Sequence, residues 1–305
     1  MNILFSSDDN YARHMGVAIY SILLHNADVE MIRFFVIDNR ISQPNIEKLK
    51  SVVHGFKNAD ISFFPFDKYE NQLHLNLTWP ISLSSYARLF IGEVLPEEID
   101  RVIYMDCDIV VDGSLKELWD EDLKDNCLGA IQDIVPYKTK TAVGLLPNQP
   151  YFNAGVLLID MTRWRKRFIG KQCLSFIESH EGRISHHDQG VLNGILCEQW
   201  KRLPLKYNVM TIHFILPQYK IKRLFKDEAA FYDAVEIEEA VNNPFILHFT
   251  PSLTNRPWER NCCHPLRYKY CQLLLNTPWG KMPLVKSNNP WYVHLFNLRF
   301  RFLPL

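Results

Sequence analysis

The first 160 residues alternate short apolar runs with amphipathic stretches, and this alternation limits the fold more than any other feature of the sequence. Residues 2–6 have the composition of a buried strand, and residues 11–25 carry apolar side chains at helical spacing. Repetition of this pair is typical of βαβ units, whose strands are parallel. Further strands are predicted at residues 31–37, 61–66, 101–105, 128–132 and 155–160. Further helices are predicted at 42–53 and 84–91, and another follows residues 186–190 and runs to about residue 196.

The pattern changes after about residue 200, where Pro, Asn and aromatic residues are frequent and periodic runs are few. This part is predicted to form loops and short helices packed over the sheet. A single hydrophobic core stops growing at roughly 250–300 residues, so a chain of 305 residues fits one α/β domain with a small addition. We expect a main domain at residues 1–260, which would carry any catalytic site, and a loop-rich C-terminal annex at residues 261–305.

Composition excludes several classes of protein. Lys plus Arg and Asp plus Glu balance at 34 each, which argues against a nucleic-acid partner. The first ten residues lack the basic start and apolar run of a signal peptide, and no apolar stretch approaches the roughly 18 residues of a membrane span. We therefore expect a cytoplasmic protein. Its seven cysteines lack paired C-x-x-C spacing and are expected to be reduced thiols.

The most informative motif is the apolar strand at residues 101–105 that runs into Asp106, Cys107 and Asp108. If the backbone stays extended, side chains two residues apart point to the same face, so the two carboxylates converge. Adjacent carboxylates repel each other unless a cation lies between them, and a hard divalent ion would also bridge the phosphates of a nucleotide diphosphate. A second D-x-D, at Asp120 and Asp122, lies in a polar stretch and is expected to be solvated surface.

Polar residues also follow the first predicted strand, from Ser6 through Asp8 and Asn10 to Tyr11. Asp and Asn at a strand-to-helix junction commonly cap the helix. The same side chains match the hydrogen-bonding edge of uracil, and Tyr11 offers an aromatic face to the base. The two interpretations are compatible, and a nucleotide base could lie there.

Three further segments carry candidate ligand-binding side chains. Arg88, on a half-apolar helix, either extends its charge to solvent or binds phosphate or a sugar hydroxyl. Asn153 and Gln189 are residue types that hydrogen-bond sugar hydroxyls, and Asp188 either does the same or caps a helix. A metal site at His186, His187 and Asp188 is disfavoured, because adjacent helical residues do not face a common point.

His248 follows an apolar run and is either structural or a ligand. An imidazole beside two carboxylates would favour manganese-like ions over magnesium. Downstream, Arg256 and Trp258 place a cation and an aromatic ring where a phosphate could dock.

In their order along the chain, these motifs resemble glycosyltransferase family 8, in particular its bacterial lipooligosaccharide galactosyl- and glucosyltransferases. The resemblance spans roughly residues 1–260 and implies the GT-A fold, a mostly parallel sheet flanked by helices, with retention of anomeric configuration. It also implies a Mn²⁺ (or Mg²⁺) ion and a UDP-sugar donor, UDP-galactose or UDP-glucose. The implied metal ligands are Asp106, Asp108 and His248.

The same resemblance assigns the remaining motif residues to the donor and its sugar. The implied donor-binding residues are Ser6, Asp8, Asn10, Tyr11, Arg88, Asp106, Cys107, Asn153, Ala154 and Arg256. The implied residues around the reacting sugar are Gln189, Asp188 and Asp133. Two departures from the family pattern stand out: the segment from His248 to Trp258 is two residues longer than usual and lacks its glycine, and Gly190 replaces a common acid.

No carboxylate is clearly positioned as a nucleophile, and Gln189 is a neutral amide, so we expect the acceptor to attack on the face from which the phosphate departs. Two other functions compete with sugar transfer. One is a metal-dependent phosphohydrolase built on His186, His187 and Asp188, and the other is a non-catalytic nucleotide-sugar-binding protein.

The acceptor implied by the resemblance is a saccharide, and the relatives it points to act on lipid-linked saccharides. Residues 291–305 are apolar and aromatic with two arginines and no acid, which fits a packed terminal segment or a contact with the membrane surface. The second interpretation would place the protein peripherally at the inner face of the plasma membrane. No residue distinguishes galactose from glucose unaided.

Overall fold

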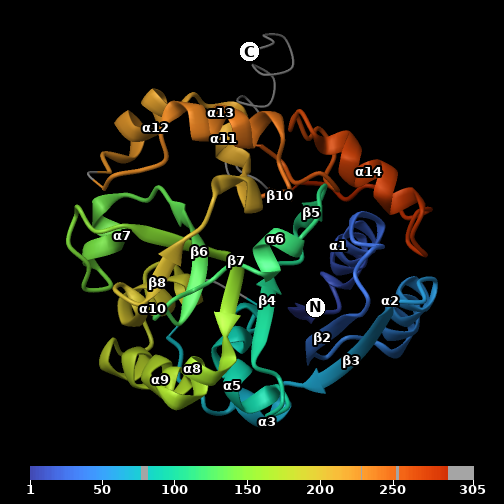
Figure 1. Ribbon diagram of the computed structural model, residues 1–305, viewed down its shortest axis with the longest axis horizontal. Coiled ribbons are helices and arrows are strands. Elements are labelled where there is room, and N and C mark those ends of the chain that lie inside the picture. Colours follow the sequence, from blue (N-terminus) through green and yellow to red (C-terminus); the bar gives the residue numbers. More distant parts are fainter. Residues whose placement is uncertain (77–81, 228, 252–253, 288–305) are drawn as a thin grey trace.

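A central sheet divides the molecule into two helical layers (Figure 1). The structure is a computed structural model that describes residues 1–305 except 77–81, 228, 252–253 and 288–305. Within these residues, seven strands form one sheet in the order β3-β2-β1-β4-β7-β6-β8. Their bounds are β1 (Asn2–Asp8), β2 (Ile32–Asn39), β3 (Ala59–Pro65), β4 (Arg101–Met105), β6 (Leu128–Asp133), β7 (Tyr151–Asp160) and β8 (Trp200–Arg202).

The parallel order predicted for the first three strands is confirmed, because β1 pairs in parallel with both β2 and β4, and β2 with β3. β7 runs antiparallel to both of its neighbours, β4 and β6. Its pairing with β6 shifts between Ala130, which faces Leu157, and Ile131, which faces Asn153. Such irregularities re-aim side chains, and this one falls on the segment that contains Asn153, Ala154 and Gly155.

Successive side chains of β1 pack into the cores on opposite faces of the sheet, which is why residues 3–5 are all apolar. Ile3 and Phe5 pack with α1 (Ala12–His25) and α2 (Gln43–His54), whereas Leu4 packs with the helices of the opposite layer. That layer comprises α3 (Asp67–Glu70), α4 (Ser84–Ala87), η1 (Arg88–Phe90), α5 (Ile91–Val94), α8 (Met161–Lys166), α9 (Ile169–Ser179) and α10 (His187–Leu196).

A second, three-stranded sheet lies within the described part of the chain and joins distant segments in the order β5-β10-β9. Its strands are β5 (Ile109–Val111), β9 (Val209–Met210) and β10 (Ile246–His248). The apolar run before His248 corresponds to β10, whereas the sequence predicted neither β5 nor β9, because two or three residues are too few to show a period. The remaining helices are α6 (Lys116–Trp119), α7 (Tyr137–Thr141), η2 (Leu205–Tyr207), α11 (Thr211–Ile215), α12 (Gln218–Phe225), α13 (Ala234–Asn242) and α14 (Arg267–Leu275).

The predicted annex joins the main core through α14, which lies beside α1 (Figure 1). Tyr270 and Leu274 belong to the same cluster as Ile3. Trp279 is buried against α1 so closely that a Cβ on Gly16 would lie 2.4 Å from its ring. The domain boundary at residue 260 stays a prediction.

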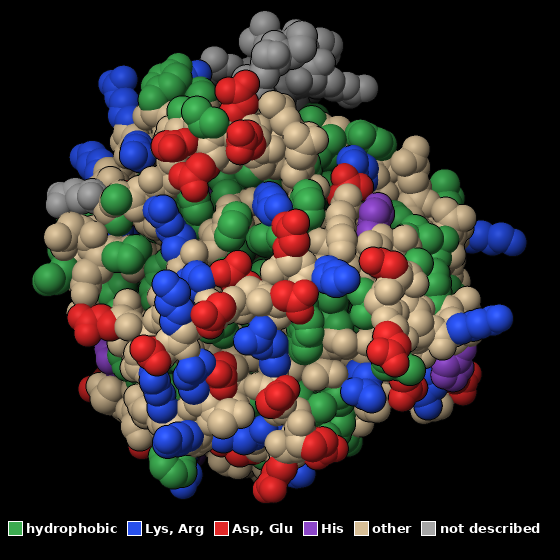
Figure 2. Space-filling view, viewed as in Figure 1, with side chains coloured by type: hydrophobic (Ala, Val, Ile, Leu, Met, Phe, Trp, Pro, Cys, Tyr) green, Lys and Arg blue, Asp and Glu red, His purple; other side chains and the backbone are tan. Residues whose placement is uncertain are grey.

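The membrane contact predicted for residues 291–305 lies outside the described residues. Within the described part, no helix is long and apolar enough to cross a bilayer. Figure 2 shows Lys and Arg side chains interspersed with Asp and Glu on the face in view, as the balanced composition predicts. All seven cysteines lie in the described part and are free thiols.

Candidate active site

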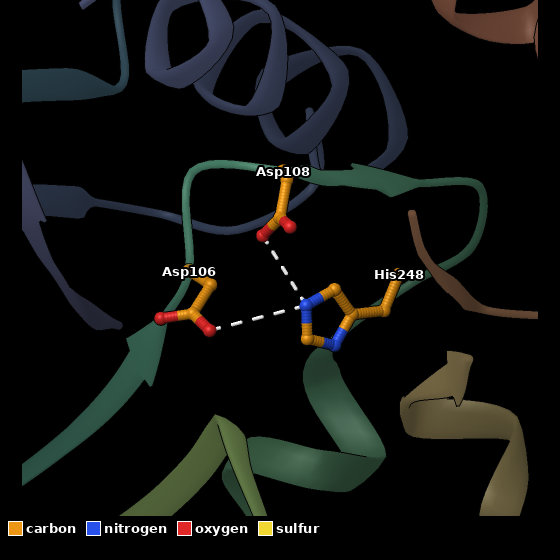
Figure 3. A group of neighbouring side chains, drawn as sticks. All are labelled: Asp106, Asp108 and His248. Carbon is orange, nitrogen blue, oxygen red and sulfur yellow. Dashed lines mark ion pairs between the residues drawn. The ribbon is translucent and has the colours of Figure 1, made fainter. Parts of the chain in front are cut away.

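Asp106, Asp108 and His248 converge at the carboxyl end of β4 (Figure 3). One potential ligand atom from each side chain lies within 4.8 Å of the other two. The His248 Nε2 atom is 3.2 Å from Asp108 Oδ1 and 3.9 Å from Asp106 Oδ2. The extended backbone predicted through Asp108 is wrong, since β4 ends at Met105 and the chain turns at Cys107 and Asp108 before β5. The turn itself brings the two carboxylates together.

The small sheet places His248 at the candidate ion site. His248 pairs with Ile109, the residue after Asp108, and the Phe249 N–H donates to the Asp108 carbonyl over 2.9 Å. A Cβ at Gly155 would lie 2.3 Å from His248 Cε1. The absent side chain of Gly155 therefore leaves the space that the imidazole fills.

Opposite charges act on each other strongly in this buried cluster. Burial raises the pKa of Asp108, but the charges of Arg256 and His248 outweigh it and hold the pKa below its ordinary value. Burial lowers the pKa of His248, and the carboxylate of Asp108 more than compensates, so the net shift is upward. Arg256 Nη1 contacts Asp108 Oδ2 directly and donates to the Phe249 carbonyl over 2.7 Å. Two carboxylates and an imidazole are a suitable ligand set for a divalent transition metal.

Arg88 lies at the centre of a second charged group, in which it pairs with Asp106 and Asp188. Its side chain is only 7% exposed, so it does not extend to solvent. Its Nη2 lies 2.7 Å from Asp106 Oδ1, its Nε lies 2.9 Å from Asp188 Oδ2, and its Nη1 donates to the Ala154 carbonyl. Asp188 lies in the first turn of α10, whose N-cap is His186, so the capping interpretation of Asp188 is wrong. Burial raises the pKa of Asp188, although Arg88 opposes the shift.

A cavity of about 520 Å³ opens beside these groups. Its lining contains most of the residues predicted to bind the nucleotide, and also serines that the sequence did not single out. The lining residues are Ser6, Ser7, Asp8, Tyr11, Ser82, Ser84, Ser85, Arg88, Tyr104, Asp106, Cys107, Asp108, Pro251 and Arg256. Ser82 Oγ donates to Asp8 Oδ2 over 2.7 Å. Asn10 is exposed in the turn before α1 and is not among these lining residues.

The residues predicted around the sugar form one hydrogen-bonded group. Gln189 Oε1 accepts from the Ala154 N–H at 3.0 Å, and Gln189 Nε2 donates to Asp133 Oδ2 at 3.2 Å. Asn153 Nδ2 donates to the same oxygen of Asp133 over 3.1 Å. Asp133 ends β6, and Asn153 and Ala154 lie on the irregular part of β7. Strands β6 and β7 and helix α10 thus bring these side chains together.

Residues 186–188 do not form a metal site of their own. His186 Nδ1 lies 3.2 Å from the Tyr151 hydroxyl and 3.3 Å from Gln189 Nε2. Asp188 is paired with Arg88. Across the described residues, the group of acids and histidines close enough to share an ion is Asp106, Asp108 and His248. The phosphohydrolase interpretation therefore lacks its ligands.

Asn208 is a residue of the site that the sequence did not reveal. It is fully buried between η2 and β9, and its amide lies between His248 and Asn153. It belongs to no motif, and its position in the loop-rich half of the chain carries no local signal.

The strand order of the seven-stranded sheet, its antiparallel strand β7 and the Asp-x-Asp turn after β4 define a GT-A-type glycosyltransferase. The chain belongs to glycosyltransferase family 8, whose sequence model, Glycosyl transferase family 8, matches residues 2–262.

Three similar proteins match this chain along most of their own length. General stress protein A of Bacillus subtilis is 31% identical over 285 residues, which cover 92% of this chain and 95% of that protein. Lipopolysaccharide 1,2-glucosyltransferase of Escherichia coli K12 is 26% identical, over 92% of this chain and 79% of the relative. The crystal structure of galactosyltransferase LgtC in complex with donor and acceptor sugar analogues superposes with a TM-score of 0.73 at 28% identity, covering 91% of this chain and 96% of LgtC.

Proposed function

We propose that this protein is a retaining hexosyltransferase that moves galactose or glucose from a UDP-sugar to a hydroxyl of a saccharide acceptor. The reaction belongs to the synthesis of lipopolysaccharide or another cell-surface glycan, as the glucosyl- and galactosyltransferase relatives suggest. The observation that carries the proposal is that three potential metal ligands converge beside a cavity lined by Asp8, Arg88 and Arg256. Retention rests on the family resemblance.

Asp106, Asp108 and His248 would hold the divalent ion. Their mixed oxygen and nitrogen ligands favour Mn²⁺ over Mg²⁺, which prefers oxygen ligands alone. Gly155 supports the fit, because it leaves room for the imidazole without moving the backbone. When bound, the ion neutralises the charge that the leaving diphosphate gains.

The protein's own side chains bind and orient the rest of the donor. Asp8 and Tyr11 line the end of the cavity at the carboxyl end of β1 and are suited to the uridine. The Arg256 guanidinium faces the same cavity and can donate hydrogen bonds to the phosphate oxygens. Because these donors are held in place beforehand, they stabilise the departing charge without reorganisation.

The surroundings of the two sugar-side acids favour attack of the acceptor from the face that the phosphate leaves. The Asp188 side chain is 8% exposed and paired with Arg88, so its carboxylate is engaged. The Asp133 oxygen Oδ2 accepts from two amides, those of Asn153 and Gln189. Both acids are suited to holding the sugar and its surroundings rather than to forming a bond with it.

Replacing the metal-site carboxylates tests the proposal. Asp106→Asn and Asp108→Asn should each weaken Mn²⁺ binding, measured by calorimetry, and lower transfer from a UDP-hexose by about 100-fold or more, because a neutral amide is a poor ligand for a hard cation. The matched control is Asp120→Asn in the second D-x-D, whose side chain is exposed. It should bind Mn²⁺ and transfer sugar normally. Wild-type, metal-independent transfer by both site variants would refute the proposal.

A further inference from the structure

We propose that Asn208 is a positioning residue that joins the ion site to the donor-sugar site and sets the tautomer of His248. This inference rests on the proposed function. Asn208 is 0% exposed and uses both ends of its amide. Its Oδ1 lies 2.8 Å from His248 Nδ1, and its Nδ2 donates to Asn153 Oδ1 over 2.9 Å.

The direction of every hydrogen bond in this group follows from its two fixed members. An ionised carboxylate only accepts, so Asp133 Oδ2 must face the NH₂ group of Asn153. The Gly155 backbone N–H only donates, and it donates to Asn153 Oδ1 over 2.9 Å. The oxygen of Asn153 therefore faces the NH₂ group of Asn208, which leaves the oxygen of Asn208 facing His248.

The orientation of the Asn208 amide determines which ring nitrogen of His248 carries the proton. Because Asn208 Oδ1 can only accept, His248 Nδ1 must carry a proton. In the neutral ring the lone pair then lies on Nε2, the atom that faces Asp106 and Asp108. Metal-bound histidines commonly have their other ring nitrogen held in this way. Here the hydrogen-bond acceptor is itself oriented from the sugar side, through Asn153 and Asp133.

Two substitutions separate the two contacts that Asn208 makes. Asn208→Leu removes both contacts. The proton of the neutral His248 ring should then no longer be held on Nδ1, and Mn²⁺ affinity should fall by about 10- to 100-fold. Asn208→Asp keeps an acceptor for the His248 Nδ1 proton but places a carboxylate against the oxygen of Asn153. It should retain Mn²⁺ affinity within about threefold and weaken binding of a UDP-hexose by about tenfold, without weakening UDP itself, because only the sugar-side contact is lost.

The measurements use the whole protein. The tautomer is read from ¹⁵N chemical shifts of the histidine rings in the metal-free protein, at a pH high enough for the His248 ring to be neutral, with His248→Gln to assign the signal among the 11 histidines. Mn²⁺, UDP and UDP-hexose affinities are measured by calorimetry. The control is Asn26→Ser, because Asn26 is equally buried and bonds the Ile22 carbonyl and the Leu115 N–H away from the site. It should lower stability and leave the tautomer and the affinities unchanged.

Two results would overturn the inference: a folded Asn208→Leu protein with wild-type tautomer and Mn²⁺ affinity, or an Asn208→Asp protein that loses UDP and UDP-hexose affinity equally. The second applies even if Asn208→Leu fails to fold. If Asp106→Asn and Asp108→Asn also bind Mn²⁺ normally, the ion site itself is misassigned. If those two variants lose Mn²⁺ and Asn208→Leu does not, only the role of Asn208 fails.

Discussion

Gly155 is the residue on which the geometry of the candidate ion site depends most directly. Its backbone carbonyl accepts from the Asp106 N–H at 2.8 Å, and its Cα faces the ring of His248. An added Cβ would come within 2.8 Å of His248 Nδ1 as well as 2.3 Å of Cε1, far inside van der Waals contact. Neither the strand nor the buried ring has space to retreat, because protein interiors are close-packed.

Gly155→Ala should therefore displace the imidazole and lower Mn²⁺ affinity by about tenfold or more, at a cost in stability of about 1–3 kcal/mol from overpacking. Calorimetric Mn²⁺ titration and urea unfolding measure the two effects. Gly55→Ala is the control, since the nearest atom to its Cβ would be a backbone oxygen at 3.3 Å in the cap of α2. Unchanged Mn²⁺ binding by Gly155→Ala would show that His248 does not need this space.

Among the secondary-structure elements, four segments of the chain are linked through the side chain of Arg88. It lies on η1 and contacts the end of β4 through Asp106, the bend of β7 through the Ala154 carbonyl, and α10 through Asp188. Its guanidinium also lies 4.2 Å from the centre of the Tyr104 ring. A planar fork can make these contacts at once, whereas a lysine ammonium is a single point of charge.

Arg88→Lys should accordingly lower transfer by about 100-fold and the free energy of unfolding by about 2–3 kcal/mol, because it leaves buried carboxylates partly unpaired. Transfer assays and urea unfolding test this. Arg165→Lys serves as the comparison, because Arg165 donates to five backbone carbonyls between Gly92 and Ile99. That variant should lose stability and keep its transfer rate per folded molecule. Equal activity of the two variants would remove Arg88 from the site.

The stability of the whole molecule should depend on pH through its buried histidines. Burial lowers the pKa of His213 to about 4 and that of His264 to about 3. No described atom forms a hydrogen bond with either ring nitrogen of His213. The unfolded chain binds these protons near pH 6.5, before the folded protein does. Stability is therefore complete above about pH 6.5 and is lost as the pH falls towards 4.

His213→Phe keeps a ring beside Phe231 and removes one of these titrating groups. The loss of unfolding free energy between pH 7 and pH 5 should shrink by about 2 kcal/mol in this variant. Urea unfolding at the two pH values measures the difference. An unchanged loss would mean that His213 is protonated in the folded protein at pH 5.

Much of the molecule's architecture could be predicted from the sequence, because it follows from local pattern. The predicted strands at residues 2–6 and 101–105 and the helix at 11–25 correspond to β1, β4 and α1, since long apolar or amphipathic runs carry their period in neighbouring residues. Side chains that follow parallel strands gather at one edge of the sheet, so Asp8 and Asp106 could be expected together. The resemblance to the family came from the order of these same motifs.

What the sequence alone determined was which residue types stand at the ends of its strands, and these already indicated a nucleotide, a sugar and a metal ion. Tertiary structure decided how they meet: the turn that joins Asp106 to Asp108, the pairing of β10 with β5, and the amide of Asn208 between His248 and Asn153. The strand pairing and the contacts of Asn208 join residues 40 to more than 130 positions apart in the chain. Local periodicity reports only on neighbours along the chain, whereas such pairings depend on which distant surfaces pack together.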